Sequence, residues 1–217
     1  MDSEKKRRPD RRRQVRTWGG VAAVVGTPLA IVIPWAQLAL WGTRPYVASA
    51  FDVGSLVGWL LAIAGLVGVI ATDSDRFGRL GRAGLAATAA GMALVAALLV
   101  RRTVLFAEAG FRAVPASGED PAGLLLSTTT VLGLALTVAG AGAIGLALRR
   151  AGDRPRVTSR LLLLAPTVPF ALIAVDLAVG LPLPLARVLV RTNAALVPFG
   201  LGWTALGVRT VSRARPH

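Results

Sequence analysis

The chain of 217 residues is 54% hydrophobic with a mean hydropathy of +0.62, which is too apolar for a soluble domain of this length. Its formal charge of +14 does not indicate nucleic-acid binding, because the basic residues stand in short blocks between apolar runs. The sequence has no cysteine and one histidine, His217, so disulfides, thiol chemistry, Cys-ligated metals and His-dependent catalysis lack the residues they need. We therefore expect no cofactor and no metal, and an all-α transmembrane bundle.

The chain begins with a strongly basic segment, residues 1–16, that carries too few apolar side chains to fold alone. We expect a disordered cytoplasmic arm that orients the first span. Attraction to anionic lipid head groups is a second role, worth about 1 kcal/mol for each basic residue near the surface. Membrane lipids are therefore one predicted partner.

The first predicted span is Trp18–Trp41, with a tryptophan at each end where its amphipathic ring favours the interface. Pro28 and Pro34 lie within this span and are expected to kink it. The alternative is a cleaved signal peptide, because Ala48–Ala50 has the small residues of a cleavage site. The apolar run before that site is about twice the usual length, which favours a retained span.

Two further apolar runs, Val53–Thr72 and Ala83–Val100, form a predicted hairpin of membrane spans. The turn between them carries three arginines, which are Arg76, Arg79 and Arg82. Positive residues favour cytoplasmic loops, so this turn is predicted to lie in the cytoplasm.

The remaining spans are predicted at Leu124–Leu148, Leu161–Gly180 and Asn193–Val208. An arginine-rich turn separates the fourth span from the fifth. The transmembrane domain is thus expected over residues 17–210, with a basic tail at 211–217.

Six spans place both termini in the cytoplasm, and the basic residues support this map. All but six of the 25 Lys and Arg residues fall on the cytoplasmic side, as the positive-inside rule requires. The six exceptions are Arg44, Arg101, Arg102, Arg112, Arg187 and Arg191.

Asp176 is the main candidate site residue, because a carboxylate within a span is costly unless it is paired or hydrated. It lies sixteen residues after Arg160, about 24 Å along a straight helix and so in the outer third of the membrane. The predicted outward-facing polar pocket comprises Asp176, Arg101, Arg102, Arg187, Arg191 and Asn193. Such a pocket is basic and suits an anion or a lipid head group. The alternative is that the arginines extend to outer head groups and Asp176 neutralises one of them.

The second and fourth spans contain a similar stretch, Leu61–Gly65 and Leu136–Gly140. Each stretch precedes an arginine-rich turn and a returning span. This pattern suggests two hairpins of the same orientation, as parallel repeats would give. Chance similarity is the alternative in a chain so rich in Ala, Gly and Leu.

No enzyme motif accompanies these spans. The sequence has no HExxH motif and no P-loop, and the glycine-rich residues 140–145 lie inside an apolar span with no strand before them. They are expected to pack helices rather than bind a nucleotide.

The segment RFGRLGRAGLAATAAGMALVAALLV, preceded by VGWLLAIAGLVGVIA, resembles uncharacterised small multi-span membrane proteins of GC-rich bacteria such as actinomycetes. The likeness covers Gly54–Val208 and consists of a similar composition of the apolar runs and a similar order of the spans. It implies a six-helix bundle in a bacterial inner membrane and assigns no site residue.

The leading functional hypothesis is a non-enzymatic multi-pass membrane protein, such as an accessory subunit. Its predicted partners are lipids and either another membrane protein or a second copy of the chain, with no nucleic acid. The alternative hypothesis is a small-solute or ion transporter that uses the pocket around Asp176.

Overall fold

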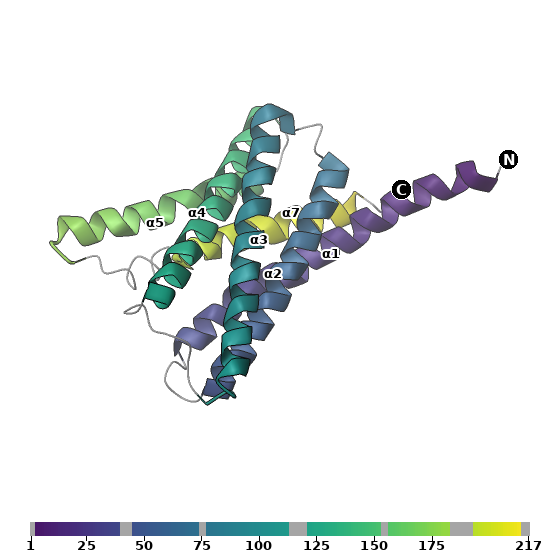
Figure 1. Ribbon diagram of the computed structural model, residues 1–217. Coiled ribbons are helices and arrows are strands. Elements are labelled where there is room, and N and C mark those ends of the chain that lie inside the picture. The colour runs from purple at the N-terminus through teal and green to yellow at the C-terminus, as the bar shows by residue number, and fades with distance from the viewer. Residues whose placement is uncertain are drawn as a thin grey trace.

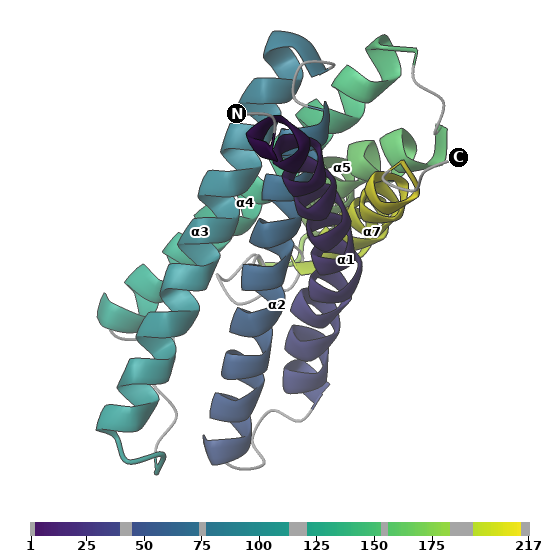
Figure 2. The same ribbon diagram turned by 90° about the vertical axis from the view of Figure 1, so that its right-hand side faces the viewer.

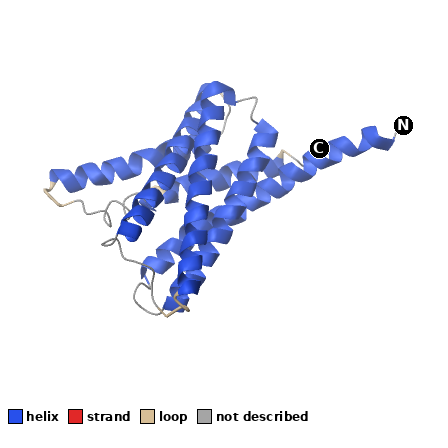
Figure 3. Cartoon of the chain, viewed as in Figure 1, coloured by secondary structure: helices blue, strands red, loops and turns tan. Residues whose placement is uncertain are grey.

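The computed structural model describes residues 3–39, 45–73, 77–112, 121–152, 156–182 and 193–213. Within these ranges the chain is helical apart from short turns and helix ends, and no strand is present (Figure 3). The prediction of an all-α chain is confirmed for this part of the protein.

The described residues form six helices, shown in Figure 1: α1 (Ser3–Ala39), α2 (Pro45–Asp73), α3 (Gly78–Glu108), α4 (Pro121–Arg150), α5 (Arg156–Ala178) and α7 (Leu196–Ser212). Five of them, α1 to α5, are long and apolar enough to cross a membrane. Each predicted span overlaps one of the six helices.

Several helices extend beyond the predicted span boundaries. Helix α2 begins at Pro45, eight residues before the apolar run, and α3 continues through Arg101 and Arg102 to Glu108. A charged side chain does not end a helix, since the backbone hydrogen bonds continue past it. Residues that the sequence placed at the edge of a span therefore lie inside a helix.

Helix α1 includes residues 3–16, where the sequence predicts a disordered arm. Lys, Arg, Glu and Gln favour helices, and the apolar part of α1 supplies a nucleus that can be extended at little cost. The N-terminal part of α1 projects beyond the other helices in Figure 1. Helix α1 also passes Pro28 and Pro34 as one helix.

The helices follow one another around a closed circuit. Each packs on the next in the chain, from α1 to α5, then α5 packs on α7 and α7 on α1. Figure 2 shows α3, α2, α1 and α7 in this order across the molecule. Helix α7 also contacts α2 and α4. Its contact with α1 joins the end of the chain to its beginning.

Glycines bring the helix backbones of the first hairpin into contact. A Cβ atom at Gly19 of α1 would lie 2.5 Å from Cα of Gly68 in α2. A Cβ atom at Gly58 would lie 2.5 Å from the backbone nitrogen of Ala30. Small residues at these positions allow close van der Waals packing, which drives helix association where lipid is the solvent.

The core contains large apolar side chains as well as these glycines. Phe199 and Trp203 of α7 stack with ring centroids 5.6 Å apart, and both are buried. Other large buried side chains are Trp59, Leu66, Met92, Phe106 and Leu162.

Many apolar side chains also point outward. Phe170 is 73% exposed, and α2 exposes Val57, Leu60 and Val67. In water this surface would favour aggregation, whereas lipid tails solvate it at no cost. The exposed surface therefore indicates a membrane-embedded bundle.

Candidate functional site at the charged ends of the bundle

Backbone contacts show which helix ends lie together. The contacting pairs are Gly19 with Gly68, Gly20 with Gly207, Gly84 with Gly140, and Gly145 with Ser159. The N-terminal ends of α1, α3 and α5 therefore lie at one end of the bundle with the C-terminal ends of α2, α4 and α7.

The described side chains divide charge unequally between the two ends. One end, which we term the arginine end, carries ten described arginines: Arg13, Arg16, Arg79, Arg82, Arg149, Arg150, Arg156, Arg160, Arg209 and Arg213. The opposite, mixed-charge end carries Asp52, Glu108 and Asp176 with Arg101, Arg102 and Arg112.

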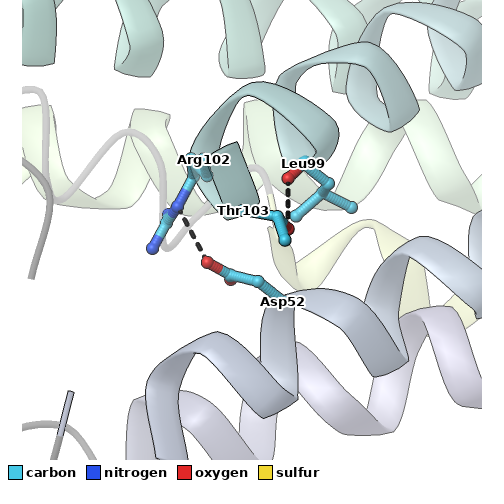
Figure 4. Close-up of polar contacts among 4 residues, drawn as sticks. All are labelled: Asp52, Leu99, Arg102 and Thr103. Atoms are coloured by element: carbon cyan, nitrogen blue, oxygen red, sulfur yellow. Dashed lines mark hydrogen bonds and ion pairs between the residues drawn. The ribbon is translucent and has the colours of Figure 1, made fainter. Parts of the chain in front are cut away.

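Asp52 and Arg102 form an ion pair between α2 and α3 at the mixed-charge end (Figure 4). The Arg102 Nε lies 3.1 Å from the Asp52 Oδ2. The Asp52 side chain is 1% exposed and that of Arg102 is 24% exposed. The next residue, Thr103, donates a hydrogen bond to the carbonyl oxygen of Leu99 at 2.8 Å, as Figure 4 also shows. A carboxylate so deeply buried requires a counter-charge, which Arg102 supplies.

Asp52 belongs to a buried polar stripe on α2. Ser49 and Ser55 are also buried and lie three residues on either side of it, hence on the same face. The sequence analysis does not name Asp52 as a site residue, because Asp52 directly precedes the apolar run Val53–Thr72. The three-residue spacing of Ser49, Asp52 and Ser55 was the signal that could have identified it.

Asp176 lies two residues before the end of α5 and is 2% exposed. A Schellman motif ends this helix, with Gly180 at a φ of +68°. In this motif the Leu181 N–H donates to the Asp176 carbonyl oxygen at 2.9 Å, and the Gly180 N–H donates to that of Leu177 at 3.0 Å. Asp176 is thus a buried carboxylate near the mixed-charge end of α5.

The described residues of the predicted pocket lie on α3, on α5 and just before α7. No described residue of α5 has its Cα within 8 Å of α2 or α3, and Arg102 pairs with Asp52 rather than meeting α5. Arg101, beside it on α3, is exposed. Asn193 is half-buried and leads into α7, which packs on α5. Arg187 and Arg191 lie outside the described residues.

Buried hydroxyl groups in the interior are bonded to backbone carbonyls. Thr27, Thr137 and Thr210 each donate to the carbonyl oxygen four residues earlier, at 2.8, 2.9 and 3.0 Å. The Thr88 hydroxyl donates across the helix interface to the carbonyl of Thr137 at 3.5 Å. These hydroxyls satisfy their hydrogen-bonding capacity with backbone carbonyls in an apolar interior.

The described residues contain no group of three or more His, Cys, Asp or Glu side chains that could hold a metal ion. Comparison of the chain with protein-family models, with curated proteins and with solved structures finds no match.

Proposed function

We propose that this chain is a non-enzymatic, multi-pass integral membrane protein that acts as an accessory subunit of a membrane assembly. The carrying observation is the close packing of the helices in the described bundle. Helix backbones touch at glycines, and the hydroxyls of Thr27, Thr137 and Thr210 bond to their own helices. A solute path needs polar groups that face each other along the bundle, so this interior favours a structural role.

The chain crosses the membrane six times when α7 is a span in addition to α1 to α5. Helix α7 has 17 residues and a length of about 26 Å, close to the thickness of a hydrocarbon layer. It packs antiparallel to α1, where Gly20 meets Gly207. Because α7 lies alongside α1, which is long and apolar enough to span a membrane, α7 would also cross the bilayer.

The arginine end is proposed to face the cytoplasm, with both termini on that side. Arginine in short loops resists translocation, and most of the described arginines lie at the arginine end. The resemblance of Gly54–Val208 to multi-span proteins of GC-rich bacteria supports a bacterial inner membrane.

Purification from native membranes tests the accessory role. The full chain, tagged at its C-terminus, would be extracted in a mild detergent alongside an unrelated six-span protein with the same tag. We expect one membrane protein to accompany the chain in constant ratio through detergent exchange and to be absent from the control. A lone chain that moves a solute across proteoliposomes would contradict the proposal.

The burial of Asp176 supports a second candidate function, a transporter with an outward-facing pocket. This function predicts that purified protein in proteoliposomes moves protons, Na⁺ or phosphate, and that Asp176→Asn abolishes the flux. The matched control is Glu108→Gln, because Glu108 is exposed at the same end. If wild-type protein gives no flux above empty vesicles, the transporter candidate is rejected.

A further inference from the structure

Helix α5 is the least covered of the five long apolar helices. Only 17% of its most apolar stretch is buried, against 61% of that of α4. Among the described helices it packs on α4 and α7 alone, and in Figure 1 the end of α5 that carries Ala178 extends away from both. A helix held on so little of its surface has few contacts that oppose its movement.

The close contacts that hold α5 lie in its first half. Gly145 of α4 and Gly202 of α7 both lie against Leu162, where an added Cβ atom would be 3.0 Å and 2.9 Å from the nearest Leu162 carbon. Gly142 of α4 lies against the ring of Pro166. The first half of α5 is therefore fixed between α4 and α7.

Beyond Pro169 the side chains of α5 are mostly exposed. Phe170 is 73% exposed, Val175 is 59% exposed and Leu177 is 62% exposed. Asp176 differs from these neighbours, because it is only 2% exposed. A buried carboxylate thus lies on a segment whose other side chains are largely uncovered.

Two prolines separate the two halves of α5. Pro166 and Pro169 have no backbone N–H, so they cannot donate to the carbonyl oxygens four residues earlier, those of Leu162 and Ala165. The loss of two helical hydrogen bonds within one turn makes the helix easier to bend at this point.

Helix α1 shows that a proline alone does not produce such a hinge. It contains Pro28, but Gly26 before the proline meets Ala62 of α2, and Ala30 after it meets Gly58 of the same helix. Both sides of Pro28 are therefore held by α2. In α5 the glycine contacts among the described residues lie on one side of the prolines only.

We propose that α5 bends at Pro166 and Pro169, with residues 156–165 as a fixed segment and residues 170–178 as a moving segment. Asp176 belongs to the moving segment, so bending carries its carboxylate from a buried position to the surface at the mixed-charge end. This hinge gives a costly buried charge intermittent access to water. It is independent of the accessory role proposed above, which requires no movement of α5.

Distances between paired spin labels test the hinge, because the sequence has no cysteine of its own. The full chain in lipid nanodiscs would carry one label at Leu132→Cys in α4 and a second at Val157→Cys or Val175→Cys in α5, all of them exposed positions. We expect the distance distribution to Val175→Cys to be at least about twice as broad as that to Val157→Cys. Equal widths would overturn the proposal.

The double variant Pro166→Ala/Pro169→Ala tests the cause of the bending. Alanine restores both N–H donors and favours the helix, so the distribution between Leu132→Cys and Val175→Cys should narrow to the width found for Val157→Cys. Pro28→Ala in α1 is the matched control and should leave this distribution unchanged. A double variant as broad as the wild type would also overturn the proposal. If the double variant does not fold, the comparison of the two wild-type widths decides the matter.

The variant Asp176→Cys tests whether bending uncovers this position. A buried thiol reacts with a water-soluble methanethiosulfonate reagent only when the segment opens, so the reaction should be about ten-fold slower once both prolines are replaced by alanine. Leu181→Cys, at an exposed position after α5, should react at the same rate with and without the prolines. Equal rates for Asp176→Cys in the two backgrounds would show that the hinge does not govern the exposure of Asp176, and the proposal would be rejected.

Discussion

The ion pair between the buried Asp52 of α2 and the partly buried Arg102 of α3 joins the α1/α2 hairpin to the α3/α4 hairpin. Asp52 and Arg102 lie near the ends of α2 and α3 that are far from their short connection, so the pair holds the open end of these two helices together. Burial of both charges costs solvation energy that their attraction only partly returns. The pair therefore specifies how the hairpins dock, and loss of either partner is more damaging than its net stabilisation suggests.

Replacement of Arg102 by Gln should destabilise the bundle by about 2 to 3 kcal/mol, because the Asp52 carboxylate stays buried without this counter-charge. Thermal unfolding in detergent measures the change. Arg101→Gln is the matched control, since Arg101 is exposed on the same helix, and should leave the melting temperature nearly unchanged. The double variant Asp52→Asn with Arg102→Gln should recover part of the loss. Equal melting temperatures for Arg101→Gln and Arg102→Gln would show that the ion pair carries no stability.

At the scale of helices, the two hairpins share one packing pattern. In each helix a glycine is followed by a small residue four positions later and a glycine three positions after that: Gly19, Ala23 and Gly26 in α1; Gly58, Ala62 and Gly65 in α2; Gly84, Thr88 and Gly91 in α3; Gly133, Thr137 and Gly140 in α4. The contacts also correspond, since Gly26 meets Ala62 as Gly91 meets Thr137, and Gly65 meets Ala23 as Gly140 meets Thr88. This correspondence supports the hypothesis of parallel repeats.

The glycine contacts predict which Gly→Ala substitutions are harmful. A Cβ atom at Gly91 would lie 2.5 Å from the Gly133 carbonyl oxygen, so Gly91→Ala must separate α3 from α4. We expect a loss of about 1 to 3 kcal/mol in the free energy of unfolding. At Gly54 the nearest atom is the end of the Ile33 side chain, which can move. Gly54→Ala should therefore be neutral or stabilising through helix propensity. Similar losses at both positions in thermal unfolding would contradict this account.

The sequence predicts the helices far better than the site. Apolar runs separated by arginine-bearing turns are sufficient to locate the spans, because the membrane imposes a fixed length on each of them. The pairing of Asp52 with Arg102 depends on how far α2 and α3 extend past those runs and on which faces meet, and neither is encoded in hydropathy. The same limit applies to Asp176, whose depth could be counted along the chain while its neighbours could not.

The whole molecule combines an arginine end with a mixed-charge end, and this asymmetry explains an exception to the positive-inside rule. Arg102 lies at the end that the proposed topology sends across the membrane, where an unpaired arginine would oppose insertion. Its pairing with Asp52 lowers that cost. The proposed orientation then depends on the basic residues of the arginine end.

This topology predicts which side of the membrane each helix end faces, and the cysteine-free sequence allows a direct measurement. Single cysteines at exposed positions would be labelled with a maleimide that does not cross membranes. Arg79→Cys, Ala151→Cys and Ser212→Cys lie at the arginine end and should react only after the cells are permeabilised. Phe111→Cys and Leu181→Cys lie at the mixed-charge end and should react in intact cells. The unsubstituted chain is the control for background labelling, and a second label after denaturation confirms that each cysteine is present. Labelling of Ser212→Cys and Leu181→Cys from the same side would mean that α7 does not cross the membrane, because these two positions bracket α7 and its preceding segment.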